Sequence, residues 1–165
     1  MTSRKLSASI VIVGALMLLV ASSAPIAGAA GAAKRLAFYQ KNSGFVYTSP
    51  SGAVTTDPQS VAPAPDSRIE FSDMDYSGSM NRHTATWTAS DHFVCVFGAT
   101  GMPTCNGQLA IGNSMLIVEG TGGQGGFAIP IVSGTGAFLG YRGSLKISDI
   151  RNTLDANIEV LISKS

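Results

Sequence analysis

The feature that most constrains this chain is the stretch at residues 129–146, which reads IPIVSGTGAFLGYRGSLK. It begins with a short apolar run bounded by turn residues, a pattern that is typical of a well-covered strand. Gly134 and Gly136 accept backbone angles that other residues disfavour, so we expect a tight turn before a second strand. Residues 137–140 are too few for a helix. We expect them to form one turn in which Phe138 plugs the end of the sheet.

The glycines of this stretch also fit a dinucleotide-binding loop, because Gly134, Gly136 and Gly140 follow an apolar run. That loop needs a following helix whose N-terminus holds the pyrophosphate. Gly140 and Gly143 disfavour such a helix, since each glycine costs about 1 kcal/mol relative to alanine. No alternation of strands and helices surrounds the stretch. We therefore expect no nucleotide here, and no other cofactor.

The remainder of the chain from residue 68 onward has short strand-like runs separated by glycine-rich turns and no convincing helix. This spacing is typical of an antiparallel sandwich or barrel. Eight strands closed into a barrel leave room for side chains or one small ligand, and closure removes exposed edges. The eight expected strands lie at residues 68–76, 83–88, 92–97, 105–111, 115–119, 127–132, 141–150 and 157–162, with a glycine-rich turn at residues 121–126.

This pattern resembles the allene oxide cyclase and dirigent barrel superfamily. Those proteins have a strand, then Gly-Gly-(Thr/Ser)-Gly, an aromatic residue two positions on, and a second glycine-bearing strand. Here the SGTG sequence at residues 133–136 fits, followed by Phe138, Gly140 and Gly143, and a serine replaces the first glycine. The resemblance extends loosely over residues 68–163. It implies an all-β fold with an eight-stranded antiparallel β-barrel, a small apolar ligand or intermediate in the lumen, and association as a homodimer or homotrimer.

The first 33 residues have the features of a secretory signal peptide. Arg4 and Lys5 precede an uncharged apolar run at residues 6–21, and small residues follow it. The run is short for a membrane span, which needs about 20 residues. We therefore expect a secreted, extracellular or envelope-associated protein without stable membrane insertion, with an uncleaved anchor as the alternative. Residues 34–165 have no basic cluster, so we expect no nucleic-acid partner.

Residues 34–67 are predicted to be an N-terminal arm or linker, and residues 68–165 the barrel domain. A short lead strand could occupy residues 34–40. The following segment, residues 42–66, contains prolines and polar residues and few that can build a core, which favours a mobile tether. The alternative is an arm that covers one mouth of the barrel, with Phe45 and Tyr47 as its contacts.

The chain has two cysteines, Cys95 and Cys105, on consecutive predicted strands. In a hairpin they can lie opposite each other, and export places them in an oxidising compartment. A disulfide that closes a loop of about 11 residues should stabilise the fold by about 2–3 kcal/mol. The alternative is a zinc site that adds His83 and His92. Because this spacing matches no usual zinc module, we expect the disulfide and no metal.

Candidate catalytic groups are few, since the sequence has no nucleophile elbow, no His-Glu-x-x-His and no phosphate-binding loop. The most suggestive are Asp73 and Asp75, which share one face of a predicted strand with Ile69 and Phe71. If that face lines the lumen, two carboxyl groups lie together in an apolar cup, with raised or split pKa values that suit general acid catalysis. Because carboxylates usually face water, we expect instead that both lie at the surface near the strand end.

Arg82 and Tyr141 complete the candidate catalytic set. Dirigent-like proteins are thought to steer a reactive intermediate inside the barrel with an acid, an arginine and a tyrosine, and this chain has those residue types. Only Arg82, which follows a glycine turn, falls in a comparable place. We expect Trp87 in the core or the barrel lining, and His83 and His92 at the surface.

Three classes of function remain open. The first is a cyclase, isomerase or dirigent-type guide, in which shape and exclusion of water help one acid or tyrosine to act. The second is a binder of a small apolar molecule without chemistry. The third is a non-catalytic secreted structural or interaction protein whose barrel is filled by side chains. The size of the lumen separates the third class from the others, and an ionisable group at the lumen separates the first from the second.

Overall fold

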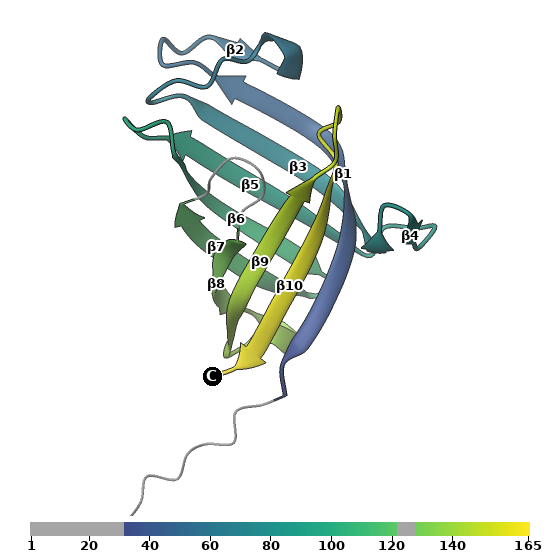
Figure 1. Cartoon of the computed structure of the whole chain (residues 1–165). Helices are drawn as coiled ribbons and strands as arrows, with labels where there is room; N and C mark the ends of the chain where they lie inside the picture. Colours follow the sequence, from purple (N-terminus) through teal and green to yellow (C-terminus); the bar gives the residue numbers. More distant parts are fainter. Residues whose placement is uncertain (1–31, 122–127) are drawn as a thin grey trace, which may run out of the picture.

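The computed structural model describes residues 32–121 and 128–165, which form a closed antiparallel barrel (Figure 1). The barrel has eight strands in the order β1-β10-β9-β8-β7-β6-β5-β3, and pairing of β1 with β3 closes it. This confirms the predicted all-β fold. The predicted signal peptide up to residue 31, and residues 122–126 of the predicted glycine-rich turn, lie outside the described residues.

The barrel strands are β1 (Lys34–Thr48), β3 (Arg68–Ser79), β5 (Ala89–Phe97), β6 (Pro103–Ile111), β7 (Ser114–Thr121), β8 (Ala128–Gly134), β9 (Tyr141–Asp149) and β10 (Ala156–Lys164). Two further short strands are β2 (Val54–Thr55) and β4 (Arg82–His83), and two 3-10 turns are η1 (Pro58–Ser60) and η2 (Gly136–Phe138). We call the end with β2, η1 and the β9–β10 turn the arm end, and the end with η2 the plug end (Figure 1).

The glycine stretch forms the predicted strand, turn and strand. β8 ends at Gly134, η2 is a single turn, and β9 begins directly after Gly140. Gly136 and Gly140 have φ angles of 56° and 78°, in the region that favours glycine. A side chain on Gly134 would collide with the backbone of Phe138. Because Gly134 has no side chain, Phe138 packs closely against it at the end of the barrel. The Phe138 ring is buried there and plugs this end, as predicted.

The barrel begins earlier than the sequence predicts, which corrects the expected boundary at residue 68. β1 is a long strand that pairs with β10 along its first half and with β3 along most of its length. Its inward residues include Phe38 and Gln40, then Phe45 and Tyr47. These two pairs are out of phase because the register shifts between Asn42 and Gly44. Such a bulge hides the two-residue period that identifies a strand.

The segment that follows β1 packs on the arm end of the barrel. Val61 contacts a small core cluster made by Phe45, Tyr47 and Ile69. The Tyr47 hydroxyl donates a hydrogen bond of 2.9 Å to the backbone oxygen of Ala62. These contacts favour the alternative of an arm that covers one mouth over a mobile tether. Phe45 and Tyr47 belong to the barrel wall on which the arm packs.

The strand expected at residues 83–88 does not form. Only Arg82 and His83 pair with β3, as β4. β3 already has β1 on one side and β5 on the other, so no edge is left for this segment. Trp87 is 57% exposed, and its predicted place in the core or lining is wrong. The expected count of eight strands nevertheless holds, because β1 takes the place of this segment.

The predicted disulfide joins Cys95 on β5 to Cys105 on β6. The two cysteines lie directly opposite each other in the strand register. Both are buried inside the barrel, where they join the main hydrophobic core. Within residues 32–121 and 128–165, no helix is long and apolar enough to cross a membrane.

Candidate functional site

Three buried carboxyl groups lie inside the barrel, two from β3 and one from β5. Asp73, Asp75 and Asp91 are only 4%, 0% and 5% exposed. Asp73 lies directly opposite Asp91 in the register. The expectation that Asp73 and Asp75 face water is therefore wrong. Closure turns the face that carries Ile69 and Phe71 inward, and the two-residue period of a strand brings both carboxyl groups with it.

Sequence reasoning missed two members of this cluster, Asp91 and Gln40. The signal for Asp91 was present, because it alternates with Ala89 and Phe93, which are both buried. A carboxyl group on the apolar face of a strand is an exception that marks a candidate site. Gln40 carried no comparable signal, since it lies just before the bulge that obscures the pattern of β1.

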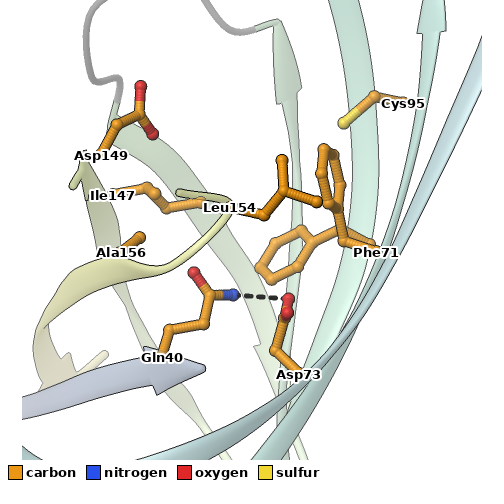
Figure 2. Close-up of a pocket in the computed structure, with 9 residues that line it drawn as sticks. Gln40, Phe71, Asp73, Cys95, Ile147, Asp149, Leu154 and Ala156 are labelled. Atoms are coloured by element: carbon orange, nitrogen blue, oxygen red, sulfur yellow. Dashed lines mark hydrogen bonds between the residues drawn. The ribbon is translucent and has the colours of Figure 1, made fainter. Parts of the chain in front are cut away.

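Amide groups from β1 hold the cluster in place. Gln40 Nε2 donates to Asp73 Oδ2 and to Asp91 Oδ2, both at 2.8 Å. Asn42 Nδ2 donates to Asp73 Oδ1 at 2.7 Å. Both oxygens of Asp73 therefore accept hydrogen bonds, as Figure 2 shows for Gln40. Within the described residues, Asp91 Oδ1 and both oxygens of Asp75 have no hydrogen-bond partner.

Burial favours the protonated form of these carboxyl groups. Burial, followed by the negative charges of Asp75 and Asp73, raises the pKa of Asp91 to about 10. Burial, followed by the charge of Asp73, raises the pKa of Asp75 to about 7. The pKa of Asp73 is also raised by burial, although the hydrogen bonds from Asn42 and Gln40 oppose the shift. The cluster therefore retains protons at neutral pH. A protonated carboxyl group has an O–H that can donate a hydrogen bond to a neighbouring carboxyl oxygen that has no other donor.

A cavity of about 120 Å³ lies beside Asp73, and we call it the inner chamber. Its walls are mainly apolar. Phe93 has room inside the barrel because Gly107 lies opposite it, and a side chain there would collide with the ring. Asp75 and Asp91 do not line the chamber, so Asp73 is the member of the cluster that reaches it. The lining residues are Gln40, Phe71, Asp73, Phe93, Cys95, Ile147, Asp149, Leu154 and Ala156 (Figure 2).

Comparison with solved structures identifies the architecture. The sequence matches no protein-family profile, and it matches no curated protein. Pyocyanin demethylase superposes with a TM-score of 0.60 at 16% identity, over 78% of this chain and 99% of that one. The pterocarpan synthase dirigent proteins GePTS1 and PsPTS1 each superpose with a TM-score of 0.56 at 16% identity, over 80% of this chain. They are covered over 83% and 94% of their own lengths.

The fold is that of the dirigent barrel. This confirms, at the level of fold, the resemblance carried by the glycine stretch. At 16% identity the superpositions establish no shared chemistry, so the site of this dirigent-type barrel rests on its own residues.

The barrel does not bring Arg82 and Tyr141 to the carboxyl cluster. Arg82 is exposed in the β3–β4 hairpin, beyond Asp75 and away from the chamber. Tyr141 is the first residue of β9 and Asp149, which lines the chamber, is the last. At about 3.3 Å per residue, this places Tyr141 about 26 Å from that end of the strand. Tyr141 packs against Phe138 at the plug end instead.

The two histidines lie outside the barrel lumen, as expected. His83 is exposed and stacks on Tyr39, with ring centroids 4.8 Å apart. His92 is 42% exposed, and its Nδ1 lies 3.0 Å from the Ser72 hydroxyl. The disulfide occupies both cysteines of the alternative zinc site. In the described part of the chain, no group of three or more histidine, cysteine, aspartate or glutamate side chains is arranged to hold a metal ion.

Proposed function

We propose that this protein is an exported dirigent-type barrel that binds a small apolar molecule in the inner chamber and guides its cyclisation or isomerisation. The observation that carries the proposal is a proton-holding carboxyl cluster at the wall of an apolar chamber. Asp73 is the group that touches the ligand and gives or takes a proton. Because cyclisation and isomerisation add no atoms, any proton that Asp73 gives at one position of the substrate must return to the carboxyl cluster from another position of the same molecule.

The walls of the chamber favour an apolar ligand of modest size. Phe71, Phe93 and Ile147 supply apolar surface, which binds the ligand and excludes water from the carboxyl group. An apolar cavity of about 150 Å³ accepts benzene in other proteins. A chamber of about 120 Å³ therefore suits a single ring or a short branched chain.

Export and self-association are part of the proposal. The composition of the first 33 residues and the disulfide both support passage into an oxidising compartment. Exposed apolar side chains on the outer wall, such as Val96 at 46% and Leu161 at 53%, support contact with a second copy.

The competing function is a non-catalytic structural or interaction protein. It is favoured by the plug half of the barrel, where aliphatic side chains fill the lumen. Under this alternative the chamber is a packing defect, and the carboxyl cluster has no ligand to act on.

Calorimetric titration with phenol distinguishes the two functions. We expect binding to the wild type and at least tenfold weaker binding to Ala156→Leu, because Ala156 lines the chamber and the larger side chain fills it. The matched control is Ala37→Leu, the same change at an exposed position on β1. A thermal unfolding scan checks that both variants fold. Equal affinity of wild type and Ala156→Leu, or no binding to either, contradicts ligand binding in the chamber.

Chemistry is tested with the molecule that co-purifies with the protein from its own culture medium, detected by native mass spectrometry. We expect the wild type to convert it into an isomer of unchanged mass, and Asp73→Asn to bind it without conversion. Equal conversion by Asp73→Asn removes Asp73 from the reaction.

A further inference from the structure

A second hollow lies at the same end of the barrel, directly outside the inner chamber. Its volume is about 520 Å³, and we call it the outer groove. Pro58 and Gln59 of η1 form one side, and Asn152, Thr153 and Leu154 of the β9–β10 turn form the other. Leu154 lines both hollows and therefore stands between them.

The two hollows differ in chemistry. Aromatic and aliphatic side chains dominate the chamber, whereas the groove presents the amides of Gln59 and Asn152. Gln59 and Asn152 are both exposed. Side-chain amides both donate and accept hydrogen bonds, so they match a neutral group that carries several hydroxyls.

Hydrogen bonds hold the elements on both sides of Leu154, whereas its own side chain is partly exposed between them. The base of the β9–β10 turn is fixed by Asp155, which accepts hydrogen bonds from the Tyr39 hydroxyl at 2.6 Å and from the Asn42 backbone N–H at 3.1 Å. On the opposite side, Asp57 Oδ1 accepts from the Gln59 backbone N–H at 2.9 Å and caps η1. Leu154 itself is 37% exposed, and its side chain points toward Phe71 in Figure 2.

We propose that the ligand spans Leu154, with an apolar ring in the inner chamber and a neutral, hydroxyl-rich portion in the outer groove. Leu154 sets the size of the group that passes between the two hollows. This rests on the proposed function, because it requires the inner chamber to bind the ring. It narrows the ligand class from any small apolar molecule to an amphipathic one, such as an aromatic alcohol carrying a sugar.

Backbone amide NMR with two probes tests the proposal. Phenol should shift amide signals of chamber residues such as Phe71, Phe93 and Ala156. Phenyl β-D-glucopyranoside, which has the same ring and a sugar, should shift these signals and also those of Gln59, Asn152 and Thr153. We expect it to bind at least threefold more tightly than phenol.

The outcomes separate the two proposals. If phenol leaves the chamber signals unchanged, the proposed function fails. If phenol binds in the chamber but the glucoside binds no more tightly and leaves the groove signals unchanged, only the spanning ligand fails.

A variant pair tests the role of Leu154. Leu154→Ala should bind 1-naphthol, which has a larger ring system, at least tenfold more tightly than the wild type does. Leu139→Ala is the matched control, since Leu139 is 71% exposed beside η2 at the plug end, and it should leave this affinity unchanged. An unchanged affinity in Leu154→Ala means that Leu154 does not control access.

Discussion

Inward-facing strand residues fill both halves of the barrel interior, but the plug half is aliphatic whereas the arm half contains carboxyl groups. In the plug half, Leu109, Leu116 and Leu145 are fully buried in an aliphatic core. In the arm half, inward-facing positions of β3 and β5 carry three carboxyl groups, and Asp73 lines a cavity. Asp91 lies directly opposite Leu109, where the two halves meet. Buried carboxyl groups without full hydrogen bonding reduce stability. The comparison indicates that the plug half stabilises the fold, while the arm half keeps an arrangement that stability alone does not favour.

The largest expected effect comes from making the same truncation in the two halves. Leu145→Ala leaves a cavity in the packed core and should reduce the free energy of unfolding by about 2–5 kcal/mol. Leu154 is 37% exposed at the chamber, so Leu154→Ala should reduce it by less than about 1 kcal/mol. Urea denaturation of both variants measures the difference. Equal losses would show that the halves do not differ in packing.

The next effect concerns the disulfide, which joins the wall of the chamber to the hydrophobic core. Cys95 lines the chamber, while Cys105 is fully buried in the core. The double change Cys95→Ala and Cys105→Ala should reduce the free energy of unfolding by about 2–3 kcal/mol, because the disulfide lowers the conformational entropy of the unfolded chain. Reduction of the wild type under denaturing conditions provides the control, and it should lower stability by a similar amount. A loss below about 0.5 kcal/mol would contradict this cross-linking effect.

The third prediction concerns the pH dependence of stability, which should arise from the carboxyl groups of the arm half. Unfolded aspartate has a pKa of about 3.9. Burial raises the pKa of Asp75 to about 7 and that of Asp91 to about 10, so the folded state binds more protons above pH 4. Their contribution to stability is therefore complete below about pH 4 and is lost as pH rises through the folded pKa values. Each group contributes at most about 1.4 kcal/mol per pH unit.

Two variants assign this pH dependence. Asp91→Asn should flatten the decline in stability between about pH 4 and pH 10, and Asp75→Asn should flatten it mainly below about pH 7. The matched control is Gln59→Ala in the exposed arm, which changes no titratable group and should leave the slope unchanged. Stability that rises with pH across this window in the wild type would contradict protonated carboxyl groups in the arm half.

The smallest expected effect is at the edge of the arm half. Tyr39→Phe removes the hydrogen bond from the Tyr39 hydroxyl to Asp155, whose distance is 2.6 Å. The free energy of unfolding should fall by about 1 kcal/mol, because the bond is partly buried and made to a carboxyl group. Amide hydrogen exchange in residues 150–155 should become faster, while that of β7 and β8 should not change. Equal acceleration in all three segments would mean that Tyr39 acts on the whole barrel.

Much of the fold could be predicted because its strongest signals are local. The turn around Gly136 requires positive backbone angles, and the cysteines flank a single hairpin loop. Only the first half of β1 was predicted, as a lead strand at residues 34–40, because the bulge near Asn42 shifts its pattern. Prolines in the following arm suggested a tether. Residues 83–88 were mistaken for a strand because strand propensity does not say whether a free edge exists. The predicted number of barrel strands was still correct, because β1 was left out of the barrel and the segment at residues 83–88 was wrongly included.

The candidate site was less predictable because it depends on contacts between distant segments. The sequence shows that Asp73 and Asp75 share a face with Phe71, but only closure of the barrel decides that this face is inside. The hydrogen bonds from Gln40 link β1 to β3 and β5, a pairing that no local pattern specifies. Arg82 was selected by residue type and local context, and its distance from the cluster follows from topology.

The most direct test of the account is a titration of the aspartate side chains followed by carbon NMR of the carboxyl groups. Burial of Asp75 and Asp91 in the arm half predicts that they titrate with pKa values of about 7 and about 10. An aspartate in the unfolded chain titrates near about 4. If Asp73, Asp75 and Asp91 all titrate near about 4 as well, the carboxyl groups are ionised and solvated at neutral pH, and the proton-holding chamber does not exist.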